Sequence, residues 1–166
     1  MVIWVTGLSG AGKTTLCKAL YAKLKKDEPA TIMIDSEVLR GILDPTLSYQ
    51  EEDRKKQVKK VQSLAKLLAD QDLTVIVAIL YSHPDLLNWN RQNFTNYFEV
   101  YLNAPLDLVK RRDPKGIYQS AARGEMKHVV GVDLPWHTPL NPNLIVNSQY
   151  EEPPEVIADQ IISSLR

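Results

Sequence analysis

The sequence lacks any excess of charge, any cysteine pair and any long apolar run. Lysine and arginine together number 20, as do aspartate and glutamate, so the net charge is zero. Proteins that bind polyanions usually show a basic excess, and a nucleic acid polymer is therefore not an expected partner. The single cysteine, Cys17, cannot form an internal disulfide, which fits a reducing, cytoplasmic compartment. The first apolar run, residues 2–5, is too short for a signal peptide or a membrane span.

Short apolar runs alternate with helix-length segments along the 166 residues. Five runs rich in branched side chains are typical of buried parallel strands: residues 2–5, 31–34, 74–80, 98–102 and 144–146. Apolar residues recur at helical spacing in residues 13–25 and 51–69, and a third helix is expected to begin near Pro153 and Pro154. We therefore expect a single domain with an α/β fold, in which helices flank a five-stranded parallel sheet.

One long stretch does not follow this alternation. Residues 111–142 are polar and contain three glycines and four prolines, with no strand-like run beyond Val129 and Val130. A long irregular segment inside a compact domain is often a functional loop that closes over a site. We predict that this segment forms a lid rather than a second domain.

The stretch Gly-Leu-Ser-Gly-Ala-Gly-Lys-Thr at residues 7–14 matches the Walker A pattern at every fixed position. It follows an expected strand and opens an expected helix, which is the context that this P-loop motif requires. Its glycines let the backbone turn N–H groups toward phosphate oxygens, and the helix adds the positive end of its dipole. Lys13 would reach the β and γ phosphates of ATP, and the Thr14 hydroxyl would bind Mg²⁺. The residues expected to contact the nucleotide are Gly7, Ser9, Gly10, Ala11, Gly12, Lys13, Thr14 and Thr15.

Nucleotide binding alone does not separate a kinase from a GTPase switch. A GTPase would need an Asn-Lys-x-Asp stretch to read guanine, and the sequence has none. It also has no conspicuous apolar run that ends in Asp-x-x-Gly, as a GTPase switch requires. These absences favour phosphoryl transfer between small molecules.

The second half of the chain carries a more specific pattern. Arg-Asp-Pro-Lys-Gly-Ile-Tyr at 112–118 and Gly-Glu-Met-Lys at 124–127 accompany the P-loop and Glu-Asp-Arg at 52–54. Together these stretches resemble the adenylylsulfate kinases over almost the whole chain. The resemblance implies a P-loop kinase that uses ATP and Mg²⁺ to phosphorylate the 3′-hydroxyl of adenosine 5′-phosphosulfate.

The resemblance also implies roles for single residues. Asp35, at the end of the second expected strand, would orient or deprotonate the acceptor hydroxyl, a role that the resemblance favours over the alternative of a helix N-cap. Arg40 and Arg54 would hold the acceptor's phosphate and sulfate, because a planar guanidinium suits bidentate contacts. The resemblance places Arg112 beside ATP and Lys127 near the acceptor's anionic group, and it makes Asp35, Lys13 and Lys127 the catalytic residues.

The departures from the family pattern concern the acceptor. The family's Asp-Gly-Asp-Asn is Asp-Ser-Glu-Val at 35–38, and its Ser-Pro-Tyr-Arg is Tyr-Ser-His-Pro at 81–84. Two aromatic residues hold the acceptor's adenine in the family; Tyr49 can stand for one, but the lid aromatic falls on Val129. Losing one stacking wall removes about 1–3 kcal/mol of base contact, which is enough to change preference. Another acceptor nucleotide, such as cytidine diphosphoramidate in capsule biosynthesis, and a non-catalytic nucleotide sensor therefore remain alternatives.

The expected partner is a small-molecule nucleotide, with no nucleic acid polymer and no membrane. A homodimer is compatible with the sequence, which leaves the oligomeric state open. His83, His128 and His137 have neither cysteine partners nor paired spacing, so a metal site among them is not expected.

Overall fold

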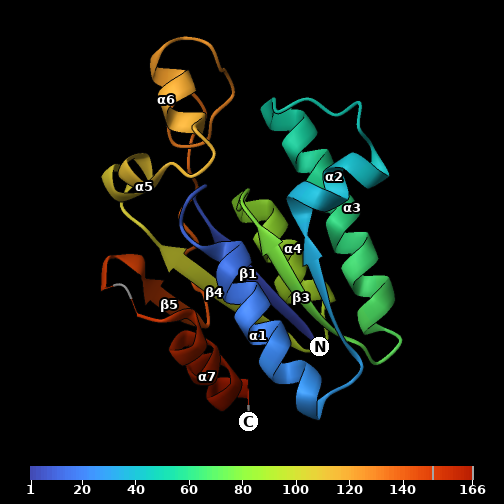
Figure 1. Cartoon of the computed structure of the whole chain (residues 1–166). Helices are drawn as coiled ribbons and strands as arrows, with labels where there is room; N and C mark the ends of the chain where they lie inside the picture. Colours follow the sequence, from blue (N-terminus) through green and yellow to red (C-terminus); the bar gives the residue numbers. More distant parts are fainter. Residues whose placement is uncertain (151, 166) are drawn as a thin grey trace.

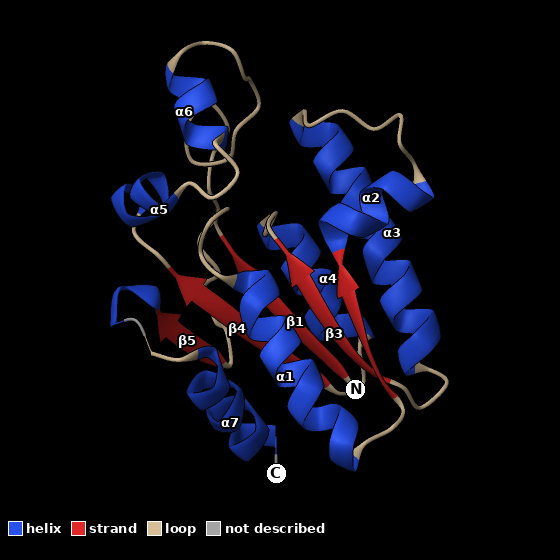
Figure 2. Cartoon of the chain, viewed as in Figure 1, coloured by secondary structure: helices blue, strands red, loops and turns tan. Residues whose placement is uncertain are grey.

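A five-stranded parallel sheet forms the centre of the computed structural model, which describes residues 1–150 and 152–165 (Figure 2). The strands follow the order β2-β3-β1-β4-β5 across the sheet. Central strands of such a sheet are covered on both faces, which is why β1 is buried at every position. The α/β fold with five parallel strands is thus confirmed, and the strand bounds lie within two residues of the predicted ones: β1 Val2–Gly7, β2 Thr31–Asp35, β3 Thr74–Ile79, β4 Tyr97–Asn103 and β5 Leu144–Asn147.

Helices cover both faces of the sheet (Figure 1). Helices α1 (Lys13–Asp27) and α7 (Pro154–Leu165) pack against each other on one face, while α3 (Glu51–Ala69) and α4 (Pro84–Asn93) pack on the other. The predicted bounds of α3 are those observed, whereas α1 extends two residues beyond its predicted end. The apolar spacing in α1 has the expected effect, because its buried side chains are Leu16, Cys17, Leu20 and Leu24.

The remaining helices lie beyond the carboxyl ends of the strands (Figure 1). They are α2 (Ser36–Leu43), α5 (Leu106–Arg112) and α6 (Ile117–Ala122), and a short 3₁₀ helix, η1 (Ser148–Tyr150), follows β5. Ligands of open α/β sheets bind outside this edge, so these helices surround the expected site.

The 111–142 segment has more regular structure than the sequence analysis expected. It contains α6, which opens at Gly116 in a left-handed conformation, and a single bridge joins Val130 to Leu134. The short α6 lacks a periodic apolar pattern long enough to be recognised in the sequence. Within the described residues, no helix combines the length and the apolar character needed to cross a bilayer.

Candidate active site

The P-loop connects the end of β1 to the start of α1. Gly10 and Gly12 adopt φ values of 81° and 98°, which side chains with a Cβ rarely adopt. Gly7 is constrained differently, because a Cβ there would lie 2.8 Å from the carbonyl oxygen of Leu102 on β4. The loop therefore needs glycine at these positions for backbone conformation and for close approach to the sheet.

Lys13 is held by the loop that precedes it. Its Nζ donates hydrogen bonds to the carbonyl oxygens of Gly7 and Leu8, at 2.9 and 2.8 Å. Burial, followed by repulsion from Lys115, lowers the pKa of Lys13 from its usual 10.5 to about 8. A bound polyphosphate would oppose both effects, since negative charge favours the ammonium form.

Asp35 faces the P-loop from the end of β2. Its Oδ2 accepts a hydrogen bond of 2.8 Å from the Thr14 hydroxyl, and its Oδ1 accepts one of 3.0 Å from the backbone N–H of Glu37. The second bond is an N-cap of α2. The N-cap interpretation is therefore confirmed, and the other carboxylate oxygen faces the nucleotide loop, while the catalytic role of Asp35 stays a prediction.

A cavity of about 410 Å³ lies over the P-loop. Lys115 from the 111–142 segment bonds to Glu37 of α2 at 3.1 Å, and both residues line this cavity. Six of the eight predicted P-loop residues, Asp35 and Arg112 also line it: Ser9, Gly10, Gly12, Lys13, Thr14 and Thr15. The other two are placed differently, since Gly7 bonds the lysine through its carbonyl and Ala11 lines the next cavity.

That next cavity, of about 180 Å³, lies between the P-loop, β5 and α7. Arg112 lines both cavities, and its Nη2 donates a hydrogen bond of 3.1 Å to the carbonyl oxygen of Ser148 in η1. The two cavities share Gly12 and Thr15 as well. They thus form adjoining spaces on either side of the loop, with a cationic side chain between them.

A third cavity, of about 170 Å³, lies on the α2 and α3 side of the P-loop. It brings together Tyr49, Arg54, Lys127 and Val129, which are four of the six predicted acceptor residues. Its other lining residues are mostly apolar and include Leu80, Ile117, Met126 and Val130. Ser9, Glu37 and Leu80 line both this cavity and the P-loop cavity, so the two spaces adjoin.

Arg40 and Arg54 both pack near Tyr49. Their guanidinium carbons lie 4.5 and 5.3 Å from the centre of the Tyr49 ring, within the range of cation–π attraction. Arg40 also donates a 2.9 Å hydrogen bond to the carbonyl oxygen of Ser48 and lines a small space of about 20 Å³ beside Arg54. Among the described residues, Arg54 lines the cavity that contains Tyr49, whereas Arg40 does not. Tyr49 thus belongs to an arginine cluster, which its position in the sequence did not reveal.

Arg54 also connects α3 to the 111–142 segment. Its Nη2 donates a 2.8 Å hydrogen bond to the carbonyl oxygen of His128, and its Nε donates one of 2.9 Å to that of Tyr49. Burial, followed by repulsion from Arg40, lowers the pKa of Arg54. Two guanidinium groups placed this close are a favourable site for an anionic group.

Sequence reasoning missed several residues around these cavities. Tyr118 donates a 2.9 Å hydrogen bond to the carbonyl oxygen of Ser9, so α6 contacts the P-loop directly, and burial raises the pKa of Tyr118 to about 12. Tyr118 ends the stretch 112–118 that carries the family resemblance, and this membership is the sequence signal that could have identified it. Glu37 lines three of these spaces, at a position where the family has a different residue, and no spacing in the sequence indicated this.

Comparisons with known proteins give one consistent family. The family model described as adenylylsulphate kinase matches residues 1–147. The adenylyl-sulfate kinase of Pseudomonas aeruginosa is 36% identical over 166 residues, which cover 99% of this chain and 84% of that protein. The adenylyl-sulfate kinase of Paraburkholderia xenovorans is 39% identical over 148 residues, covering 89% of this chain and 83% of that protein.

Solved structures agree with this result. A Mycobacterium tuberculosis APS kinase, solved in complex with AMPPNP and APS, superposes with a TM-score of 0.91 at 30% identity, covering 99% of this chain and 96% of that one. A shikimate kinase from Aquifex aeolicus has a TM-score of 0.60 at 16% identity, covering 99% and 96% of the two chains, and it supports the fold alone. The match of the family model over most of the sequence confirms the resemblance: the chain belongs to the adenylylsulphate kinase family.

Proposed function

We propose that the protein is an adenylylsulfate kinase, which transfers the γ-phosphoryl group of ATP to the 3′-hydroxyl of adenosine 5′-phosphosulfate. The observation that carries the proposal is the position of Asp35. Its carboxylate is bonded to Thr14 of the P-loop, and the P-loop cavity adjoins the cavity of Tyr49, Arg54 and Lys127. A donor in the first cavity and an acceptor in the second would meet beside this carboxylate.

The donor would bind along the P-loop. Backbone N–H groups of residues 9–15 and the Lys13 ammonium would contact the phosphates, and Arg112 would lie near the nucleoside in the adjoining cavity. The Thr14 hydroxyl oxygen fits Mg²⁺, which prefers hard oxygen ligands. When bound, Mg²⁺ would neutralise charge that develops on the β and γ phosphates.

The acceptor would bind between α3 and the 111–142 segment. Tyr49 and Val129 would contact its base, Arg54 and Lys127 would contact its anionic groups, and Arg40 would add charge from behind Tyr49. Asp35 would accept a hydrogen bond from the 3′-hydroxyl of the acceptor. This bond would orient a lone pair of the hydroxyl oxygen toward the γ-phosphorus, and the carboxylate would take the hydroxyl proton. Closure of the 111–142 segment, already bonded to Glu37 through Lys115, would exclude water and so limit ATP hydrolysis.

A second acceptor is favoured by one observation. Val129, a small aliphatic residue, lines a cavity of only about 170 Å³, at the position where the family has an aromatic residue. A smaller pyrimidine would need less stacking surface, so a nucleotide such as cytidine diphosphoramidate is the alternative acceptor. A nucleotide sensor without catalysis is a weaker alternative, because it would have no use for Asp35 opposite the P-loop.

A single-turnover assay with Mg²⁺ and γ-labelled ATP separates these functions. The purified protein is mixed with adenosine 5′-phosphosulfate, with cytidine diphosphoramidate or with no acceptor, and labelled product is followed by chromatography. Faster transfer to adenosine 5′-phosphosulfate supports the main proposal, and faster transfer to the cytidine compound supports the second acceptor. Equal ADP release in all three mixtures, with no labelled nucleotide product, would refute both kinase functions.

Assembly and location remain predictions. A homodimer can be tested by sedimentation velocity at several protein concentrations, because a dimer would have twice the 18.8 kDa mass of the chain. The cytoplasmic location can be tested by fractionation of the source cells.

A further inference from the structure

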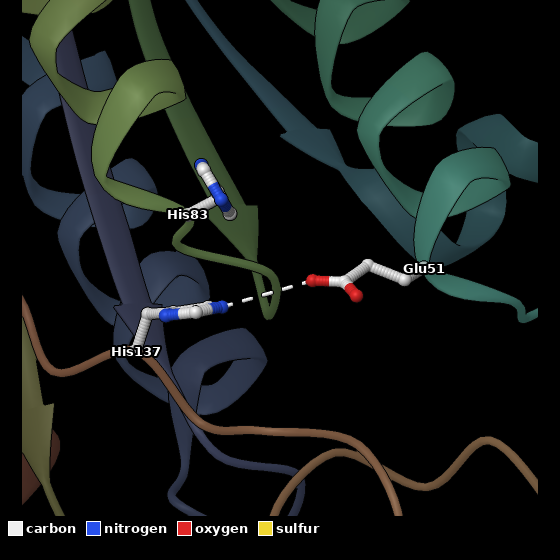
Figure 3. A group of neighbouring side chains, drawn as sticks. All are labelled: Glu51, His83 and His137. Atoms are coloured by element: carbon white, nitrogen blue, oxygen red, sulfur yellow. Dashed lines mark ion pairs between the residues drawn. The ribbon is translucent and has the colours of Figure 1, made fainter.

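Three side chains that are far apart in the sequence converge near the start of α3. Glu51 is the first residue of α3, His83 is the N-cap of α4, and His137 lies on the 111–142 segment. Figure 3 shows that the Glu51 carboxylate and the His137 ring point toward each other, with His83 beside them. One ligand atom from each residue lies within 4.8 Å of the others.

The cluster holds a polar atom without a hydrogen-bond partner. His137 Nε2 is buried and forms no hydrogen bond among the described residues. It lies 3.8 Å from Glu51 Oε1, which is too far for a hydrogen bond (Figure 3). The centroids of the His83 and His137 rings are 4.9 Å apart, and the ring planes are inclined at 68° to each other. A buried imidazole nitrogen aimed at a carboxylate across this gap is suited to a bound ion.

Neighbouring groups hold the three side chains in place. Tyr81 donates a 2.6 Å hydrogen bond to Glu51 Oε1, and the Ser82 hydroxyl donates one of 2.6 Å to the His137 carbonyl oxygen. His83 Nδ1 accepts the backbone N–H of Asp85 at 3.3 Å, and a cation bound through this nitrogen would replace that long bond. The bonds to the Glu51 carboxylate and to the His137 backbone hold the other two ligands in position.

We propose that Glu51, His83 and His137 bind a divalent transition-metal cation of the Zn²⁺ class, at a site separate from that of Mg²⁺ on the P-loop. Two imidazoles and one carboxylate suit Zn²⁺ and its transition-metal neighbours, whereas Mg²⁺ prefers an all-oxygen shell. Bond lengths of 2.0–2.2 Å in a tetrahedral site place ligand atoms roughly 3.3 Å apart. Side-chain rotations would therefore bring the ligand atoms closer together by up to about 1.5 Å, and water would complete the shell.

The site would join three separate parts of the fold. A bound cation would hold the 111–142 segment, which carries Lys127 and Val129, to α3 and α4. His83 lies in the stretch 81–84, where this chain departs from the family pattern. The proposed site therefore includes a residue at which this chain departs from the family pattern, and it lies outside the P-loop.

Calorimetry with Zn²⁺ alone tests the proposal. The full chain is prepared without a histidine tag, treated with a chelator and titrated in millimolar Mg²⁺, which occupies oxygen sites. We expect one equivalent of Zn²⁺ to bind with micromolar or tighter affinity. At a free concentration of about 100 times Kd, Tm should rise by about 5–10 °C. Failure of the wild-type protein to bind Zn²⁺ would overturn the proposal.

Matched histidine variants identify the ligands. His83→Gln and His137→Gln should each weaken Zn²⁺ binding at least tenfold and abolish the rise in Tm. His128→Gln is the control, because it removes a histidine of the same segment outside the cluster and should bind as the wild type does. Circular dichroism in chelator shows whether each variant folds. Undiminished binding in both cluster variants, or loss in His128→Gln alone, would contradict the assignment.

Discussion

Replacing Asp35 by asparagine and by alanine separates its two roles. Asparagine keeps an oxygen that can accept the N–H of Glu37, so the cap of α2 survives, but its amide cannot take a proton from an acceptor hydroxyl. Alanine removes both functions. If Asp35 acts as the base, both variants should therefore lose activity, whereas only alanine should lose the cap.

The expected magnitudes follow from these contacts. Asparagine and aspartate cap helices about equally well, so Asp35→Asn should change the free energy of unfolding by less than about 0.5 kcal/mol. Asp35→Ala should lose about 1 kcal/mol, which corresponds to a Tm lowered by roughly 2–4 °C. Turnover should fall by about 100-fold or more in both, the usual effect of removing a general base. ATP affinity should change little, because the P-loop is intact.

The assay combines single-turnover kinetics, calorimetric ATP binding and thermal melts on the same preparations. Turnover of Asp35→Asn within a few fold of the wild type, with a lower Tm for Asp35→Ala, would mean that Asp35 is only a cap. A large loss of ATP affinity in Asp35→Asn would mean that Thr14 depends on this carboxylate to shape the nucleotide site. Either result would refute the reasoning above.

Three further predictions concern the nucleotide loop and the acceptor cavity. Because the free Lys13 has a pKa of about 8, ATP binding should raise that pKa and take up roughly 0.1 proton at pH 7 and 0.9 at pH 9. Calorimetry in buffers of different ionisation enthalpy measures this uptake, and Lys13→Arg should abolish its rise with pH. Val129→Phe should tighten adenosine 5′-phosphosulfate binding about fivefold or more, by calorimetry, because it restores a stacking wall; no gain would place the base elsewhere. Gly7→Ala should lower the free energy of unfolding by about 1–3 kcal/mol, because its Cβ would meet the Leu102 carbonyl oxygen at 2.8 Å. Gly41→Ala, in open space within α2, should instead raise it by about 0.4–1 kcal/mol in the same urea titrations.

Local sequence signals predicted the sheet and the P-loop because their causes are local. Runs of branched residues specify buried strands, and the P-loop glycines lie in the conformations that their residue type allows. The N-cap at Asp35 also has a local cause, because the side chain bonds to the backbone two residues further along the chain. These features depend on neighbours along the chain or on the sheet edge that all parallel strands share.

Other features depend on contacts between distant segments and left no trace in spacing. The bond from Arg54 to the His128 carbonyl oxygen joins residues 74 apart in the sequence. Glu51, His83 and His137 likewise come from three elements, so no ligand pattern could be read from the sequence. The α6 helix was missed because a helix of six residues is too short to show a period.

The position of the transferred phosphate is the most direct test of the proposed function. After reaction with Mg²⁺, ATP and adenosine 5′-phosphosulfate, proton–phosphorus correlation NMR of the nucleotide product identifies the carbon that carries the new phosphate. The proposed function predicts a new phosphorus signal coupled to the ribose H3′. A spectrum with only ADP and inorganic phosphate, or with the phosphate coupled to another ribose proton, would contradict it.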